Sequence, residues 1–253
     1  TNIGHGPLWR ITPVKGESWV CNDVHVMTLA GTNRHFGEVI DIPLNEHIAK
    51  NSRRGRVDRD WKLMRVGVTF PPCDVPVDPY LVGLWIGDGS TGKPSITNGE
   101  PEIRDYCRRI APLYGAELVE REDAKHNTWD LRFRIAECDR EAGRHVNVLS
   151  RFFCNDCSRD GAKVIPDCYL YNDEATRLAI LAGIVDTDGF IFKGTIEVTT
   201  VSPVLRDQYL YLARSLGLAA YTSEKIATIK SIGFTGLYQR VTISGDIDRI
   251  PRP

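Results

Sequence analysis

Several features of specialised proteins are scarce in this chain of 253 residues. Charged residues interrupt every apolar stretch well before the ~20 residues that a membrane-spanning helix needs. The N-terminus lacks a basic region followed by an apolar core and a small-residue cleavage site, and Gly and Pro form no low-complexity block. We therefore expect a soluble protein with no membrane partner, which is not secreted and resides in the cytoplasm or, in a eukaryote, in the nucleus.

A surplus of positive charge is also missing. The chain holds 32 Lys and Arg against 33 Asp and Glu, a formal net charge of -1. Proteins that neutralise phosphates need an excess of basic residues, so the total by itself argues against a nucleic-acid partner. The local exception is the stretch 50–65, with seven Lys or Arg against two Asp. Such a run is usually a solvated surface, yet it is the one concentration of positive charge in the chain.

The seven cysteines are an odd number, which favours free thiols in a reducing compartment. Cys154 and Cys157 form one C-x-x-C pair, which could supply half of a zinc site. The other half would have to come from scattered residues such as Cys138, His145 or Cys168. One pair is a weak signal, so we expect buried, inert thiols and no structural zinc.

The most informative feature is a pair of similar segments that lie 100 residues apart. They read Leu-Val-Gly-Leu-Trp-Ile-Gly-Asp-Gly over 81–89 and Leu-Ala-Gly-Ile-Val-Asp-Thr-Asp-Gly over 181–189. Residues typical of helix starts precede both, namely Pro79 in one case and the run Asn-Asp-Glu at 172–174 in the other. Gly commonly follows a helix in the left-handed conformation. We therefore predict two short helices, each ending at an Asp-Gly.

Matching elements are expected after each segment, which indicates an internal duplication. The first set is an extended run at 94–97, a helix at 102–114 and hairpin strands at 116–121 and 128–135. The second set is a strand at 190–202, a helix at 204–216 and strands at 219–223 and 238–244. The chain is thus predicted to be α+β, with halves at about 76–172 and 173–253. A separate, mostly β region of short runs (8–13, 19–29, 37–42) and a basic linker fills residues 1–75.

Small residues predict how the two motif helices pack. They lie four apart on one helical face of each motif: Gly83 and Gly87 in the first, Gly183 and Thr187 in the second. This spacing lets two helix backbones approach closely and would bring the following aspartates, Asp88 and Asp188, side by side. Either motif alone would more simply be a core helix ending in a surface Asp, but two copies with matching downstream elements argue against that.

Two carboxylates at adjacent helix C-termini repel each other and both helix dipoles. The arrangement is costly unless cations occupy it, and hard divalent ions with oxygen ligands, Mg²⁺ above all or Mn²⁺, suit it best. The pair of aspartates therefore predicts a divalent-metal site.

The two motifs resemble those of the LAGLIDADG (DOD-type) homing endonucleases, of the kind encoded within inteins. The second copy is the closer match, and the first has Ile86 where an Asp is usual, a departure that intein-type members share. The resemblance covers about 76–250. It implies a monomer with a pseudo-twofold duplicated αββαββα-like fold, whose two antiparallel sheets bind a long asymmetric target in double-stranded DNA.

The resemblance also implies residue roles. In that family the eighth-position aspartates hold divalent metal and act in phosphodiester hydrolysis, which assigns these roles to Asp88 and Asp188, with Gly87 and Thr187 beside the metal. A Gly-x-Lys-x-Ile-Pro pattern at 161–166 makes Lys163 the first basic catalytic residue, although a lone Lys there would otherwise be a solvated loop residue.

A symmetric second lysine is not evident. It should follow the stretch 244–251, where only Arg249 and Arg252 are available, unless Lys225 or Lys230 folds back into the site. A member with one weakened site would nick one strand, and a catalytically inactive DNA-binding remnant would keep both motif helices as a core interface. These alternatives stay open beside the double-strand endonuclease.

The strands that would face DNA alternate in polarity. At 130–135 apolar Leu131, Phe133 and Ile135 alternate with polar Asp130, Arg132 and Arg134, and the run 195–199 alternates similarly, although a half-solvated sheet gives the same pattern. The residues expected to contact DNA are Arg53, Arg54, Arg56, Arg132, Arg134, Lys193, Thr199 and Arg240.

Residues 8–29 are similar to the middle of the protein-splicing (Hint) domain of inteins. A histidine in an Asn-x-x-His context activates the N-terminal splice junction there, and Asn22 and His25 match it. A plain structural histidine is the simpler alternative, because Thr1 and Pro253 do not supply the terminal splicing residues in their familiar form. We expect the interior of an intein, or a descendant of one, that needs missing terminal fragments to splice.

Overall fold

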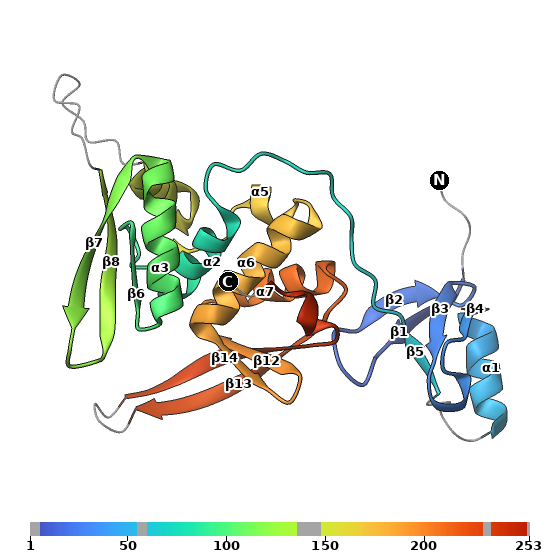
Figure 1. Cartoon of the computed structure of the whole chain (residues 1–253). Helices are drawn as coiled ribbons and strands as arrows, with labels where there is room; N and C mark the ends of the chain where they lie inside the picture. Colours follow the sequence, from blue (N-terminus) through green and yellow to red (C-terminus); the bar gives the residue numbers. More distant parts are fainter. Residues whose placement is uncertain (1–5, 55–59, 136–147, 230–233, 252–253) are drawn as a thin grey trace. The chain divides into compact units, whose positions relative to one another are not determined.

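The computed structural model describes residues 6–54, 60–135, 148–229 and 234–251, and the chain divides into two compact units, Thr1–Val66 and Gly67–Pro253 (Figure 1). This division lies ahead of the one predicted at residue 75. Within the described residues, no helix is both long and apolar enough to cross a membrane.

The described part of the first unit is built from two small antiparallel sheets, one α-helix and a 3-10 turn (Asn33–His35). Strands β1 (Leu8–Ile11) and β2 (Trp19–Asn22) form a hairpin, and β4 (Val39–Pro43), β3 (Val26–Gly31) and β5 (Trp61–Leu63) form a sheet in that order. The run predicted at 19–29 is two strands, because the chain turns where the His25 N–H donates to the Asn22 carbonyl (3.3 Å). The basic stretch begins within helix α1 (Leu44–Arg54) and ends near β5.

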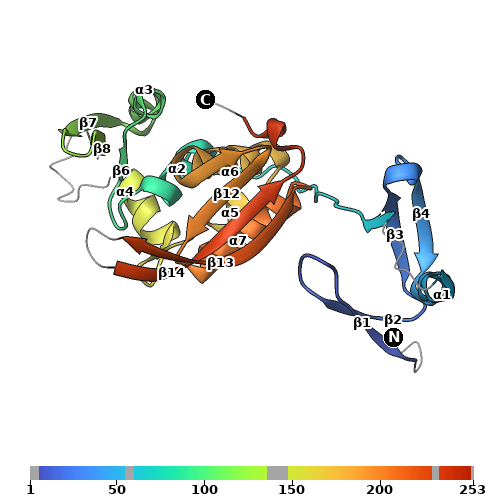
Figure 2. The ribbon, with the colours of Figure 1, turned by 90° about the horizontal axis from the view of Figure 1, so that it is seen from below.

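The second unit repeats one order of elements. Its first half contains α2 (Pro79–Asp88), β6 (Ser95–Asn98), α3 (Pro101–Ile110), β7 (Ala116–Asp123) and β8 (Thr128–Ile135). Its second half contains α6 (Glu174–Asp188), β11 (Gly189–Phe192), β12 (Thr195–Thr200), α7 (Pro203–Ser215), β13 (Ala219–Ile229) and β14 (Phe234–Ser244). The sheets are antiparallel, in the orders β6-β8-β7 and β11-β12-β14-β13, which confirms the α+β class. Figure 2 views the second sheet from its open face, with α6 and α7 behind it.

Short elements connect the halves and close the chain. They are α4 (Val148–Arg151), a π-helical turn (Phe152–Asp156), β9 (Ser158–Arg159), β10 (Ala162–Lys163), α5 (Asp167–Leu170) and a final 3-10 turn (Ile247–Arg249). The Phe153 ring stacks on Trp85 of α2 with centroids 4.7 Å apart, so this connection packs against the core of the first half.

The stretch predicted as one strand at 190–202 is a hairpin of β11 and β12. Lys193 (φ +49°) and Gly194 (φ +72°) both adopt positive φ, which gives a two-residue turn of the type that matches strand twist. The first half has only an isolated bridge between Gly89 and Ile96 at the corresponding place. The duplication is therefore incomplete at this hairpin.

The glycines that end both motif helices do not adopt the predicted left-handed conformation. Gly89 has φ -71° and Gly189 has φ -86°, so at both places the chain runs directly from helix into extended structure. A Cβ on Gly89 would collide with the Trp85 carbonyl oxygen, and one on Gly189 with that of Val185. Close approach to the preceding turn, and not φ, requires glycine at both positions.

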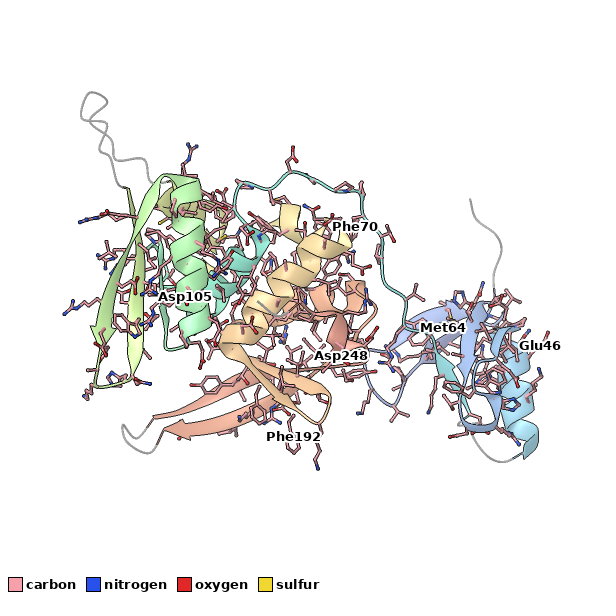
Figure 3. The ribbon with its side chains drawn as sticks, in the orientation of Figure 1. Glu46, Met64, Phe70, Asp105, Phe192 and Asp248 are labelled. Atoms are coloured by element: carbon pink, nitrogen blue, oxygen red, sulfur yellow. The ribbon has the colours of Figure 1, made fainter. Side chains whose placement is uncertain are left out.

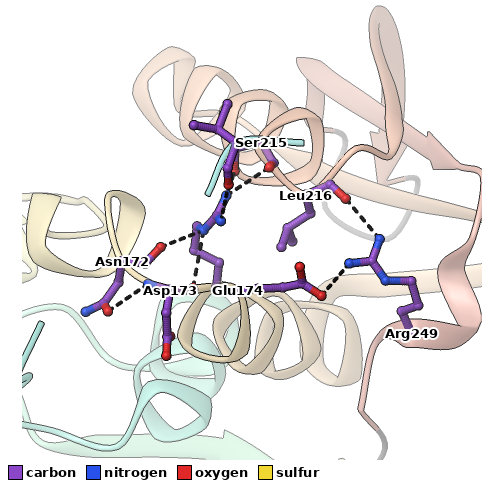
Figure 4. A network of polar contacts seen from close by, with 8 residues as sticks. Asn172, Asp173, Glu174, Ser215, Leu216 and Arg249 are labelled. Atoms are coloured by element: carbon purple, nitrogen blue, oxygen red, sulfur yellow. Dashed lines mark hydrogen bonds and ion pairs between the residues drawn. The ribbon is translucent and has the colours of Figure 1, made fainter. Parts of the chain in front are cut away.

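A buried arginine ties three segments of the second unit together. Arg177 is 1% exposed, and its guanidinium donates to the carbonyl oxygens of Asn172 (2.9 Å), Ser215 (2.9 Å) and Val68 (2.6 Å). Figure 4 labels Asn172 and Ser215 in this network. The guanidinium also lies over the ring of Phe70, labelled in Figure 3, 5.1 Å from the centroid. The start of α6, the end of α7 and the entry segment of the unit are thereby held in register.

Candidate active site at the ends of two packed helices

Helices α2 and α6 pack directly against each other through glycine (Figure 1). A Cβ on Gly83 would lie 2.9 Å from the Gly183 Cα, and one on Gly183 would lie 2.6 Å from the Leu84 nitrogen. A Cβ on Gly87 would lie 2.7 Å from the Thr187 Cβ. The four small residues of the motifs thus occupy the interface, with backbones too close for larger side chains.

Helix-start chemistry fixes where each helix begins. The Asp78 carboxylate accepts from the backbone N–H groups of Tyr80 (2.9 Å) and Leu81 (3.2 Å), and the Asp173 carboxylate accepts from that of Thr176 (2.9 Å). Across the interface the Tyr80 hydroxyl donates to the Asp186 carboxylate (2.8 Å). Asp186 is the sixth residue of its motif, and its counterpart Ile86 is buried and apolar.

The last residues of both helices are the aspartates Asp88 and Asp188. The Asp188 carboxyl carbon lies 3.5 Å from where a Gly87 Cβ would stand, so it abuts the end of α2. Although Asp188 keeps an exposed surface, surrounding protein and the charge of Asp88 raise its pKa to about 6. Burial also raises the pKa of Asp88, against the opposing effects of Asn98 and Lys163. The two acids are therefore crowded in the way predicted for a cation site.

Lys163 lies at the end of β10 beside these carboxylates. Its Nζ donates to the carbonyl oxygens of Ile86 (2.9 Å) and Gly87 (2.8 Å) in the last turn of α2 and lies over the Trp85 ring, 5.3 Å from the centroid. Burial lowers its pKa to about 8, while the charges of Asp188 and Asp88 oppose that shift. A cation thus stabilises the negative end of α2 within the candidate site.

Asn98 is a site residue that sequence reasoning missed. Its Nδ2 donates to the Asp88 carboxylate (2.6 Å) from strand β6. The Gly89 to Ile96 bridge folds β6 back over the motif and brings the two residues together. A contact set by this bridge leaves no periodic signal in the sequence.

Thr187 contributes less than expected to a metal site. Its hydroxyl donates within α6, to the carbonyl oxygens of Gly183 (2.9 Å) and Ile184 (3.1 Å). The backbone carbonyl of Thr187 is then the group of this residue that could approach a cation at the helix ends, whereas the Gly87 carbonyl already accepts from the Lys163 Nζ (2.8 Å).

The residues present fit a hard divalent cation. Two adjacent carboxylates with raised pKa values would gain from such an ion, and Ca²⁺ or Mg²⁺ sites are built from oxygen ligands. Among the described residues, no group of three or more His, Cys, Asp and Glu converges, so waters or substrate phosphate would complete the ligand set. Of the zinc candidates, Cys157 is buried with a raised pKa, whereas Cys138 and His145 lie outside the described residues.

The three sheet arginines expected to contact DNA are paired with carboxylates. The Arg134 Nε donates to Glu117 (2.6 Å), the Arg240 Nε lies 3.4 Å from Glu197, and the Arg132 Nη2 lies 3.8 Å from Asp130. Thr199 stands opposite Arg240 in the register of β12 and β14, and Lys193 lies in the β11–β12 turn. Arg53 and Arg54 end α1, with side chains outside the described set, and Arg56 lies outside the described residues.

The candidates for a second catalytic cation do not converge on the aspartates in the part of the chain that is described. Arg249 donates to the Leu216 carbonyl (3.1 Å) and to Glu174 (2.5 Å), the first residue of α6. Asp188 is the last residue of that helix, and a 15-residue helix spans about 20 Å. Lys225 is exposed on β13, and Lys230 and Arg252 lie outside the described residues.

In the first unit, Asn22 is the last residue of β2 and His25 lies in the turn that leads to β3. The His25 carbonyl accepts from the Leu44 N–H (2.9 Å), and its side chain is exposed. The turn is therefore fixed through its backbone.

Comparison with known proteins finds a family model that matches one half of the second unit. Residues 175–249 match the family model of the LAGLIDADG-like domain. The homothallic switching endonuclease of Saccharomyces cerevisiae is 28% identical over 171 residues, which cover 58% of this chain and 28% of that protein. The replicative DNA helicase DnaB of Mycobacterium intracellulare is 29% identical over 204 residues, which cover 78% of this chain and 30% of that protein. The ATP-dependent DNA helicase Hel308 of Thermococcus kodakarensis is 27% identical over 208 residues, which cover 76% of this chain and 17% of that protein.

The chain spans less than a third of the length of each of these relatives. Among solved structures, a crystal structure of I-DmoI in complex with DNA and Ca is similar with a TM-score of 0.45 and 16% identity, over 66% of this chain and 82% of that one.

Proposed function

We propose that this chain is a site-specific homing endonuclease of the LAGLIDADG type, which hydrolyses both strands of a long asymmetric target in double-stranded DNA with Mg²⁺ or Mn²⁺. The observation that carries the proposal is the meeting of Asp88 and Asp188 at the ends of two helices packed through glycine. The family match over 175–249, which includes Asp188, and the similarity to a switching endonuclease support it.

The residues around the helix ends suit this reaction. Asp88 and Asp188 would hold the cation, with the Gly87 and Thr187 carbonyls beside it. When bound, such an ion polarises the scissile phosphate and lowers the pKa of an attacking water. Lys163 remains largely protonated at neutral pH, with its pKa of about 8, and would balance negative charge that develops on the phosphate.

DNA would lie along the open faces of the two sheets. Exposed Arg132 and Arg134 on β8, and Thr199 and Arg240 in the second sheet, would contact base edges or phosphates. Lys193 and the basic residues Arg53, Arg54 and Arg56 would add backbone contacts. Because one chain contains both halves, we expect it to act as a monomer.

The test is selection of cleaved sites from a randomised duplex library with Mg²⁺, followed by cleavage of the selected site. Asp88→Asn and Asp188→Asn should each abolish double-strand cleavage and leave DNA binding largely intact. Asp207→Asn, an exposed acid on α7 (65%), is the matched control and should cut normally. Metal-dependent double-strand cutting at the wild-type rate by either motif variant would overturn the assignment.

A second candidate is a nickase or a DNA-binding remnant, and the one-sided hydrogen bonding of Lys163 favours it. Its Nζ donates to carbonyl oxygens of α2, although its charge acts on both Asp88 and Asp188, and Arg249 stands at the far end of α6. Strand-labelled plasmid carrying the selected site would distinguish these activities. Accumulation of nicked circles with one strand intact indicates a nickase, linear product indicates the double-strand enzyme, and binding without any cut indicates the remnant.

We also propose that the chain derives from an intein. One segment aligns with an endonuclease and with two proteins named as helicases, over only 17–30% of their lengths, as an inserted element would. Asn22 and His25 in the first unit suit a splicing domain. Mixing the protein with candidate flanking fragments should give a ligated product. Absence of ligation by a protein that cuts DNA would limit its activity to the endonuclease.

A further inference from the structure

Strand β11 exposes three consecutive large apolar side chains immediately after the second motif. Phe190 is 61% exposed, Ile191 53% and Phe192 58%. The rings of Phe190 and Phe192 are nearly parallel (12°), with centroids 6.3 Å apart. Exposed apolar residues on the edge strand of a sheet invite association, and no described residue stacks on them from another strand. The exposed apolar surface of this strand is therefore a candidate contact surface for a partner.

The register of the sheet shows which face the two rings occupy. Phe190 pairs with Glu197 and Phe192 with Thr195, so both share a face with Thr199 and its partner Arg240. The alternate residues of β12, Ile196 and Val198, are buried under the helices. The aromatic pair thus continues the open face proposed to lie on DNA, and Figure 3 shows Phe192 projecting away from the helices.

A cation borders the aromatic pair. The turn that joins β11 to β12 places the Lys193 Nζ 5.1 Å from the centroid of the Phe192 ring. A partner that matches this surface has apolar groups beside negative charge. The major groove of DNA offers both, because thymine carries a methyl group there and phosphates line the edges.

The feature is confined to one half of the unit. After Gly89 the chain reads Ser-Thr-Gly-Lys-Pro over 90–94, without an aromatic residue, and makes a single bridge in place of β11. A duplex on the two sheets would therefore meet aromatic side chains on one side of its centre.

We propose that Phe190 and Phe192 recognise thymine methyl groups in the major groove on the side of the target that faces the second half, while Lys193 contacts a backbone phosphate. This rests on the proposed endonuclease function. Phe192 lies four residues beyond Asp188, or about 13 Å along a strand, so the thymines lie within about four base pairs of the phosphate at the helix ends.

The experiment replaces single thymines of the selected duplex by deoxyuridine, which removes only the methyl group. Binding is measured for the wild type and for Phe190→Ala/Phe192→Ala. One or two substitutions within the four base pairs should weaken wild-type binding about four-fold each, and should have no effect on the double variant. Ile191→Ala, on the other face of the same strand, should keep the thymine sensitivity, and Lys193→Gln should weaken binding to all sequences.

Each outcome bears on the proposal. A wild type that binds and cuts its selected site but ignores deoxyuridine, or a double variant that keeps the sensitivity, overturns the inference and leaves the endonuclease standing. A library from which no site is selected overturns both. A wild-type dimer that the double variant dissolves, without any deoxyuridine effect, assigns the rings to a second copy of the chain and overturns the inference as well.

Discussion

Replacing Asp188 by Asn should stabilise the metal-free protein while it abolishes cleavage. In the native state the surrounding protein and the Asp88 charge raise the pKa of Asp188 to about 6, from an ordinary value of 3.8. At about 1.4 kcal/mol for each pKa unit, this is up to about 3 kcal/mol of native-state cost when the carboxylate is ionised. Because Asp188 keeps an exposed surface, solvent screens much of that cost, and we expect Asn to recover about 1 kcal/mol.

The pH dependence of this gain has a defined sign. At low pH Asp188 is protonated in both the native and the unfolded state, so its charge costs nothing. As pH rises from about 4 to 6 the unfolded state ionises first, and the native wild type loses stability relative to it. Above pH 6 both states are ionised and the cost is constant. The advantage of Asp188→Asn should therefore be absent near pH 4 and reach a plateau near pH 7.

Thermal unfolding in EDTA over this pH range measures the effect. A gain of 1 kcal/mol raises Tm by about 2–4 °C for a unit of this size. Added Mg²⁺ should stabilise the wild type and not the variant, because the variant lacks one of the two carboxylates. Asp207→Asn should show neither the pH-dependent gain nor the loss of the Mg²⁺ response. A variant that is less stable than wild type at pH 7, or equally stabilised at pH 4, would refute the electrostatic argument.

Three further substitutions test the packing around the site by chemical unfolding. Gly83→Ala places a methyl group 2.9 Å from the Gly183 Cα, which forces α2 and α6 apart and should cost about 1–3 kcal/mol; wild-type stability would contradict this contact. Arg177→Met removes the donor to the carbonyl oxygens of Asn172 and Val68, while that of Ser215 keeps the Val68 N–H, and should cost about 3 kcal/mol; a neutral result would mean that water replaces the guanidinium. Tyr80→Phe removes the donor to Asp186 and should cost about 1 kcal/mol, whereas no change would show that this bond adds nothing across the interface.

Local sequence patterns predicted the elements that carry the candidate site. The apolar runs ending in Asp-Gly form helices α2 and α6, and the alternating run at 128–135 forms β8. These predictions hold because the spacing of apolar residues within a short stretch of sequence distinguishes a helix from a strand. The same patterns could not reveal the hairpin turn at Lys193 and Gly194, since a Lys with positive φ is unusual and the apolar alternation continues across it.

Contacts between distant segments could not be predicted from the sequence, for a different reason. Asn98 reaches Asp88 only because one bridge folds β6 over the motif. Arg177 meets Val68 and Ser215 only after α7 and the entry segment have docked. Neither residue has a spacing that distinguishes it from a solvated polar side chain, so tertiary packing alone assigns their partners.

The balance of charge is now explained by where the charges lie. Acidic residues partner arginines of the open faces: Glu117 hydrogen-bonds to exposed Arg134, and Glu197 lies 3.4 Å from half-buried Arg240. In the proposed complex with DNA, each pair would open and exchange a carboxylate for a phosphate or a base edge, which would leave little net gain from phosphate contacts alone. A base edge that fits restores the lost hydrogen bonds, whereas one that does not leaves the arginine with its original partner. Neutrality of the chain is therefore compatible with DNA binding and shifts the free energy of binding towards sequence readout.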